Sequence, residues 1–227
     1  MPERTASLPD RLPIFPLRGA LLLPGGNLPL NIFEPRYLDM VRDAMQGDRV
    51  IGMIQPKPEG EGLPDGEETL GGEGGVMPAL YRTGCIGRIS NFSETEDGRF
   101  LITLTGLCRF DLAQELEVAT RYRQVTADYD RWRHDLQPGA PPPELRGDLL
   151  PALRLYFDRH GIEADWDAIE AAPLGGLVTS LCMICPFEPE EKQALLEAQD
   201  IGRQARLLVA LMRMEAMAEP GSLGVRH

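Results

Sequence analysis

A proline-rich stretch, QPGAPPPE at residues 137–144, divides this sequence into two parts with different hydrophobic patterns. Three consecutive prolines form a stiff, extended spacer and do not fit inside a helix or a central strand. Short runs of strand-forming residues dominate before the stretch, whereas apolar stripes at helical spacing dominate after it. The sequence therefore predicts an α+β protein with a β-rich subdomain at 12–130, a linker at 131–143 and a helical subdomain at 144–218.

The first part opens with two extended segments joined by a turn. Pro13 and Pro16 exclude a helix from RLPIFPLRGALLL, PGGN is typical of a turn, and LPLNIF predicts a second strand. EPRY then predicts a helix with Pro35 at its first position, where the missing N–H has no partner to lose. Asp97–Gly98 predicts a tight hairpin. Short strands that bend at glycines favour a closed or nearly closed β-barrel; these glycines are Gly84, Gly87 and Gly106.

Helical spacing replaces this pattern after the linker. Three apolar stripes, and a segment EPEEKQALLEA that begins near Pro189, predict four helices in a small bundle. The stripes are Leu149, Leu153, Tyr156 and Phe157, then Leu177, Leu181 and Ile184, then Ile201, Ala205, Leu208 and Met212.

The chain is acidic, with a formal net charge of −12. Nucleic acids and anionic membranes select for Lys and Arg patches, so the charge disfavours both as main partners and favours solubility as its role. The Gly-, Pro- and acid-rich segment at 56–75 predicts a mobile loop. The sequence has no apolar run of membrane-spanning length, no signal-peptide core at its start, and only four cysteines in 227 residues. These features predict a reduced, cytoplasmic protein.

No motif in the sequence carries catalytic or metal-binding chemistry. CMIC, from Cys182 to Cys185, lacks the second CxxC that a zinc site needs, and it ends an apolar stripe, so buried thiols are favoured there and at Cys85 and Cys108. There is no G-x-x-x-x-G-K-[ST] motif, and the acidic GGEGG run would repel phosphate. His160 suits a helix C-terminus rather than a catalytic set. We therefore predict no catalytic residues, no metal and no cofactor.

Several motifs, in their order and spacing, resemble one known family. The stretch LPIFPLRGALLLPGGNLPLNIFEPRYLDMVRDAM is similar to the start of the N-terminal, substrate-binding domain of Lon proteases. GCIGRI, LTGLCRF and the tail MICPFEPEEKQALLEAQDIGRQARLLVALM resemble later motifs of that domain, so the likeness covers nearly the whole chain. The resemblance implies a PUA-like β-barrel followed by a helical subdomain, and a role in recognising proteins.

The sequence also departs from full-length Lon proteases, which continue into an ATPase and a Ser–Lys peptidase domain. It has no Walker motif, and its two lysines, Lys57 and Lys192, lie where no peptidase lysine is expected. The resemblance thus implies a stand-alone, non-catalytic module that binds unfolded or exposed apolar polypeptide segments. Its expected role is that of an adaptor in protein quality control, with a protease or chaperone as partner.

The candidate binding surface surrounds the first two strands and the first helix. It comprises Leu23, Leu28, Phe33 and Tyr37, which flank a Pro/Gly turn that can hold side chains outward. A strand edge there could also pair with an extended peptide. The alternative is that these residues fill the barrel core. Core packing is favoured for Phe33, whereas Leu28, beside the turn, is expected to be the most exposed.

Two other functions remain open at this point. One is a small-molecule pocket between barrel and bundle, because pockets favour domain junctions. The other is RNA binding, which only the PUA-like architecture and a local basic stretch suggest. That stretch comprises Arg121, Arg123, Arg131 and Arg133.

Overall fold

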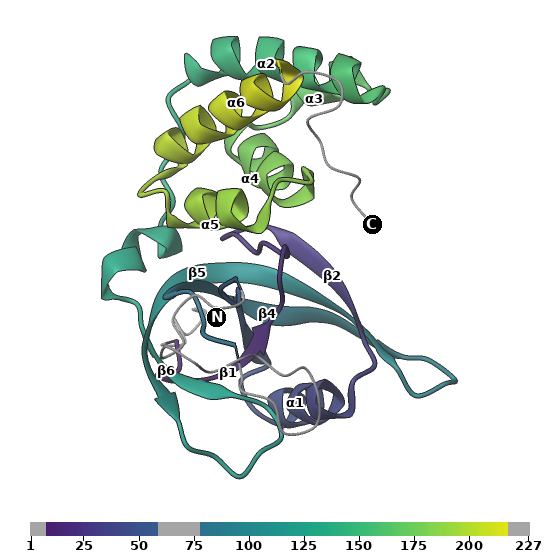
Figure 1. Cartoon of the computed structure of the whole chain (residues 1–227), viewed down its shortest axis with the longest axis vertical. Coiled ribbons are helices and arrows are strands. Elements are labelled where there is room, and N and C mark those ends of the chain that lie inside the picture. The colour runs from purple at the N-terminus through teal and green to yellow at the C-terminus, as the bar shows by residue number, and fades with distance from the viewer. Residues whose placement is uncertain (1–7, 59–77, 218–227) are drawn as a thin grey trace, which may run out of the picture. The chain divides into compact units, whose positions relative to one another are not determined.

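The computed structural model describes residues 8–58 and 78–217 and divides the chain into two compact units between Pro138 and Gly139 (Figure 1). The boundary lies within the proline-rich stretch that separates the two sequence patterns. Most of the acidic segment 56–75, predicted to be a mobile loop, lies outside the described residues.

The first unit is built on a mixed, six-stranded sheet that closes on itself. Its strands are β1 (Arg11–Pro16), β2 (Asn27–Ile32), β3 (Val50–Ile54), β4 (Thr83–Glu94), β5 (Phe100–Leu116) and β6 (Gln124–Asp128). Their order is β2-β5-β4-β3-β1-β6, and β6 also pairs with β5, so all strands except β2 form a closed ring. β1 and β3 are parallel, and the other pairs are antiparallel. The predicted α+β class with a β-barrel is confirmed.

Gly106 marks a place where two segments far apart in the sequence touch. A Cβ atom there would lie 2.1 Å from the carbonyl oxygen of Leu23, so no larger residue fits without a backbone shift. The Gly106 N–H donates to the oxygen of Gly26 at 2.9 Å, and the Gly106 oxygen accepts from the N–H of Gly25 at 2.9 Å. The leucines at 21–23 are buried behind this contact. β1 ends before them, so RLPIFPLRGALLL is not one continuous strand.

Helix α1 (Pro35–Gln46) follows β2 directly. Pro35 occupies its first turn, as the sequence predicted, and Glu34 before it is extended. The helix ends at Gln46, and the N–H of Gly47 donates to the oxygen of Ala44 at 3.1 Å. Its apolar stripe, which includes Met40 and Val41, is buried.

A 3₁₀-helix, η1 (Asp130–Leu136), fastens the end of the first unit to its barrel. Trp132 is 1% exposed and belongs to the core cluster of the sheet. The guanidinium of Arg109, on β5, lies 4.0 Å from the Trp132 ring and donates to both carboxylate oxygens of Asp135, at 2.8 and 2.6 Å. The η1 residues therefore belong to the first unit rather than to a linker over 131–143, because the buried tryptophan and ion pair hold them there.

The second unit is helical. It contains α2 (Leu145–His160), α3 (Trp166–Ala171), α4 (Leu174–Ile184), α5 (Pro189–Glu197) and α6 (Ile201–Met217). α6 packs against α2, α4 and α5. α3 was not predicted, because its six residues are too few to show a helical stripe. None of the helices in the described ranges is long and apolar enough to cross a membrane.

The cysteines are buried, which confirms that prediction for Cys85, Cys108, Cys182 and Cys185. Burial raises the pKa of the Cys185 thiol to about 11. Ile184, predicted on the buried stripe of α4, is instead 70% exposed, because it is the last residue of that helix. Within the described ranges, no group of His, Cys, Asp and Glu side chains could hold a metal ion.

Candidate functional site

The four residues predicted to form a binding surface lie in different environments. Leu23 and Tyr37 are only 1% and 6% exposed, so core packing applies to both. The expectations for the other two are reversed, because Phe33 is 63% exposed whereas Leu28 is half-buried. Alternation along β2 explains this difference, since Leu28 and Leu30 lie on the inner face of the strand while Phe33 follows its end.

Tyr37 is buried next to the predicted surface and does not form part of it. Its ring lies 4.2 Å, centroid to centroid, from the ring of Phe15 on β1, and the Arg36 guanidinium lies 4.6 Å from it. Burial raises the pKa of the Tyr37 hydroxyl. Tyr37 thus packs the start of α1 against β1 of the barrel.

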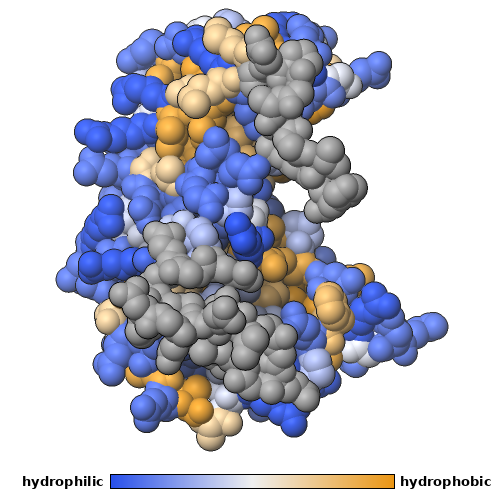
Figure 2. Space-filling view, viewed as in Figure 1, coloured by the Kyte–Doolittle hydropathy of each residue, from blue (hydrophilic) through white to orange (hydrophobic). Residues whose placement is uncertain are grey.

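Beyond the closed barrel, three strand segments form an extension that we call the hairpin arm. It consists of β2, residues 89–94 of β4 and residues 100–105 of β5, and its β4–β5 hairpin projects from the first unit in Figure 1. Two further apolar side chains reach solvent here: Leu101 is 46% exposed and Phe92 is 37% exposed. Figure 2 shows hydrophobic surface on the part of the first unit from which the hairpin projects.

The two faces of the hairpin arm differ in chemistry. The outer face is mostly polar: the Thr105 hydroxyl lies within hydrogen-bond distance of the side-chain oxygens of Asn27, at 2.7 Å, and Ser90, at 2.9 Å. Leu101 breaks this polar face, opposite Asn31 in the β2–β5 register. The sequence indicated that Leu101 lies on the face of the strand opposite to the apolar positions that alternate with it after the Asp97–Gly98 turn. Leu101 was nevertheless not predicted to be part of the binding surface. The inner face carries the apolar side chains of the arm.

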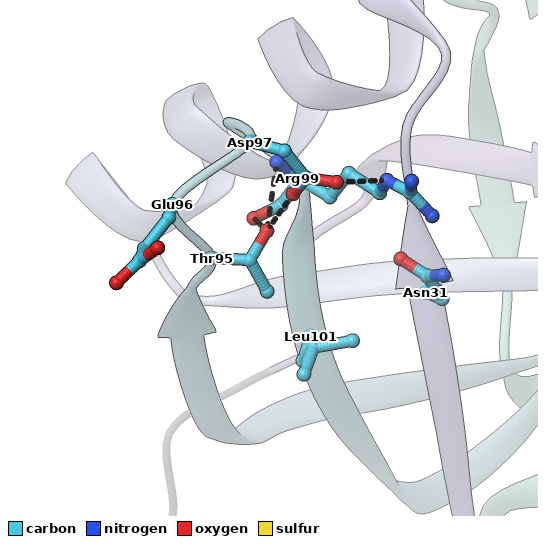
Figure 3. A pocket seen from close by; sticks show the side chains of 6 residues that line it. All are labelled: Asn31, Thr95, Glu96, Asp97, Arg99 and Leu101. Atoms are coloured by element: carbon cyan, nitrogen blue, oxygen red, sulfur yellow. Dashed lines mark hydrogen bonds and ion pairs between the residues drawn. The ribbon is translucent and has the colours of Figure 1, made fainter.

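A shallow depression lies on the outer face near the hairpin tip. It is lined by Asn31, Thr95, Glu96, Asp97, Arg99 and Leu101 (Figure 3). The tip is internally bonded: the Thr95 N–H donates to the Arg99 oxygen at 2.9 Å, and Arg99 pairs with Asp97 at 2.7 Å. A hydrogen bond from the Thr95 hydroxyl lowers the pKa of Asp97. Glu96 points away from the other side chains in Figure 3.

The residues that line the depression come from β2, from the start of β5 and from the turn between β4 and β5. Its lining combines a leucine, an amide and a charged rim, and it is open to solvent. Such a surface matches side chains of a polypeptide better than it encloses a small molecule.

The local basic stretch does not form an open positive patch. Arg123 donates to both carboxylate oxygens of Glu115 at 2.6 Å, and Arg133 pairs with Asp130 at 2.6 Å. Arg131 stacks at 4.3 Å on the ring of Trp132 and lies 3.7 Å from Asp111. Arg121 lies 3.8 Å from Asp39. Each of the four arginines thus lies within 4 Å of a carboxylate, and two of these carboxylates also face a further arginine, Asp39 facing Arg42 and Asp111 facing Arg82.

Comparison with known proteins agrees with this architecture. A family profile for the ATP-dependent protease La (LON) substrate-binding domain matches residues 11–214. The chain belongs to the Lon substrate-binding domain family. The match spans both units, so the barrel and the helices together correspond to the family domain.

Individual relatives support the same assignment. The chain is 25% identical over 208 residues to "Lon protease 2" of Myxococcus xanthus, covering 90% of this chain and 24% of that protein. It is 28% identical over 208 residues to "Lon protease" of Anaeromyxobacter dehalogenans (strain 2CP-C), covering 90% and 23%. The chain therefore spans about a quarter of the length of these two relatives.

Solved structures confirm the fold. A Lon N-terminal domain protein from Xanthomonas campestris aligns with a TM-score of 0.57 at 23% identity, covering 88% of this chain and 97% of that one. The N-terminal domain of a Lon protease from the Mycobacterium avium complex aligns with a TM-score of 0.56 at 14% identity, covering 89% and 97%.

Proposed function

We propose that this Lon substrate-binding domain protein binds unfolded or exposed apolar segments of polypeptide through the hairpin arm. The observation that carries the proposal is the exposure of Leu101, at 46%, on the arm and of Phe33, at 63%, directly after its strand β2, while the other exposed side chains of the arm are mainly polar. Exposed apolar groups within a polar surround are typical of interaction sites. Since the chain is acidic, affinity for a client comes mainly from apolar contact.

The chain has no catalytic role of its own in this proposal. It acts as an adaptor in protein quality control in the cytoplasm, presenting clients to a protease or chaperone. Nucleic acid is disfavoured as a partner by the paired arginines and the net charge of −12. A small-molecule pocket between barrel and bundle stays a prediction from the sequence.

A matched pair of leucines tests where clients bind. Leu101, on the arm, is 46% exposed, and Leu155, on α2 of the other unit, is 44% exposed. Leu101→Asp is expected to weaken binding of a reduced, carboxymethylated test protein about fivefold or more, since covering half a leucine contributes about 1 kcal/mol. Leu155→Asp introduces the same charge and is expected to change affinity less than twofold. Equal effects of both variants would contradict the proposed site.

A further inference from the structure

Among the residues that the structure describes, the end strand of the sheet, β2, is bonded along one edge and has no partner strand along the other, which we call its free edge. Within the described ranges it pairs only with β5, over six residues and without a register shift. The other open edge of the hairpin arm, on β4, is interrupted by a shift between Ile89 and Asn91. Irregularities of that kind discourage pairing with another chain, so β2 is the better template.

The direction of the free backbone groups of β2 follows from two hydrogen bonds. The Gly106 N–H donates to the Gly26 oxygen, so every second residue after Gly26 bonds to β5. On the opposite side of β5, the Thr95 N–H donates to the Arg99 oxygen, so the backbone groups of the odd-numbered residues of β5 bond to β4. The even-numbered residues of β5 therefore bond to β2. Both bonds lead to the same result: the backbone groups of three β2 residues face the free edge, and these are Asn27, Pro29 and Asn31.

Pro29 occupies one of these outward positions, where its missing N–H breaks no bond to β5. The free edge thus offers three carbonyl acceptors but only two N–H donors, from Asn27 and Asn31. An antiparallel ladder of two copies of β2 that includes both prolines would lack two hydrogen bonds. A different extended segment would lack only one. Pro29 therefore disfavours self-pairing and leaves the edge open to a non-identical strand.

The side chains beside this edge indicate which sequences fit. Leu28 and Leu30 lie half-buried on the inner face, at alternate positions, while Asn27, Pro29 and Asn31 are exposed on the outer face. A strand added to β2 would place every second side chain beside the two leucines. Apolar, β-branched residues at alternate positions match that face best.

We propose that an extended client segment with apolar residues at alternate positions binds as an additional strand on the free edge of β2. The inference rests on the proposed function and specifies its mode: main-chain hydrogen bonds give affinity, and the Leu28–Leu30 face selects the side chains.

A backbone scan of the ligand tests this mode. The probe is a fluorescent peptide of alternating valine and threonine with lysine at each end, and each central nitrogen is methylated in turn. Strand addition predicts a period of two: methylation at alternate positions weakens binding about tenfold, whereas methylation between them has little effect. Slippage of the peptide by two residues preserves this pattern, because it keeps the same face toward the leucines.

A matched pair of variants tests the protein side of the same ladder. Asn31→Pro and Asn31→Ala both remove the amide side chain, but only proline also removes the outward N–H. Asn31→Pro is expected to bind the peptide about three- to tenfold more weakly than Asn31→Ala, the range for one lost hydrogen bond. Circular dichroism melts establish that both variants are folded.

The outcomes distinguish a failure of strand addition from a failure of the proposed function. If Leu101→Asp abolishes binding but no N-methyl group weakens it, strand addition is wrong and the proposed function is retained. Equal affinities of the two Asn31 variants likewise overturn it. If neither the peptide nor the carboxymethylated test protein binds to the intact chain, the proposed function itself fails.

Discussion

Replacing Phe33 by aspartate is the most direct perturbation of the proposed binding surface. A fully covered phenylalanine buries about 200 Å², so the 63% that is exposed here corresponds to about 120 Å². At about 25 cal/mol per Å², covering all of that area contributes about 3 kcal/mol, or about 150-fold in Kd. A client that covers half of it contributes about 1.5 kcal/mol, so Phe33→Asp is expected to weaken binding at least tenfold.

Fluorescence anisotropy with a labelled, carboxymethylated test protein measures this change. Ile184→Asp is the control, because Ile184 is 70% exposed and lies in the helical unit. Phe33→Ser separates the loss of apolar area from the added charge. The free energy of unfolding should change by no more than about 0.5 kcal/mol in these exposed positions. Unchanged client binding by a folded Phe33→Asp protein would refute the reasoning, as would an equal loss in Ile184→Asp.

Three further predictions concern stability and chemistry. Asp135→Ala removes the buried carboxylate that accepts two hydrogen bonds from the Arg109 guanidinium and is expected to destabilise the first unit by about 3–5 kcal/mol, visible as a lower Tm; an unchanged Tm would show that η1 is not held by this pair. Replacing Cys182 and Cys185 together by serine should lower Tm without changing client affinity, and elemental analysis should find no stoichiometric zinc. Because the pKa of Cys185 is raised to about 11, its thiol should react with Ellman's reagent at pH 8 only after denaturation. The purified chain should neither hydrolyse ATP nor degrade casein, and turnover that co-purifies with it would contradict that expectation.

The sequence was informative where a local pattern determines structure. Pro35 starts α1 because its fixed φ and missing N–H suit a first turn. Gly106 was expected at a bend because strands curve at glycines, and the structure adds its contact with Leu23. The buried cysteines followed from their apolar neighbours.

Features that depend on long-range packing were not accessible from the sequence. Trp132 lies in DRWRHDL, which has neither a strand nor a helix period, so its burial against the sheet had no local signal. Phe33 looks like a core residue, and only the end of β2 and the start of α1 turn it outward. Leu101 required knowledge of which face of β5 is solvated, and that depends on where β2 and β4 pair.

Closure of the barrel has a consequence for how the chain folds during synthesis. β1 pairs with β6, so Arg11 meets Thr126, and β6 also pairs with β5. Contacts between residues so distant in sequence form slowly, because a long loop must be ordered before they are gained. On the ribosome the ring therefore stays open until β6 has emerged, and the apolar strands before it remain uncovered for that time. A protein proposed to hold unfolded segments passes through such a state itself, and its nascent N-terminal unit is expected to need chaperone protection until that strand is available.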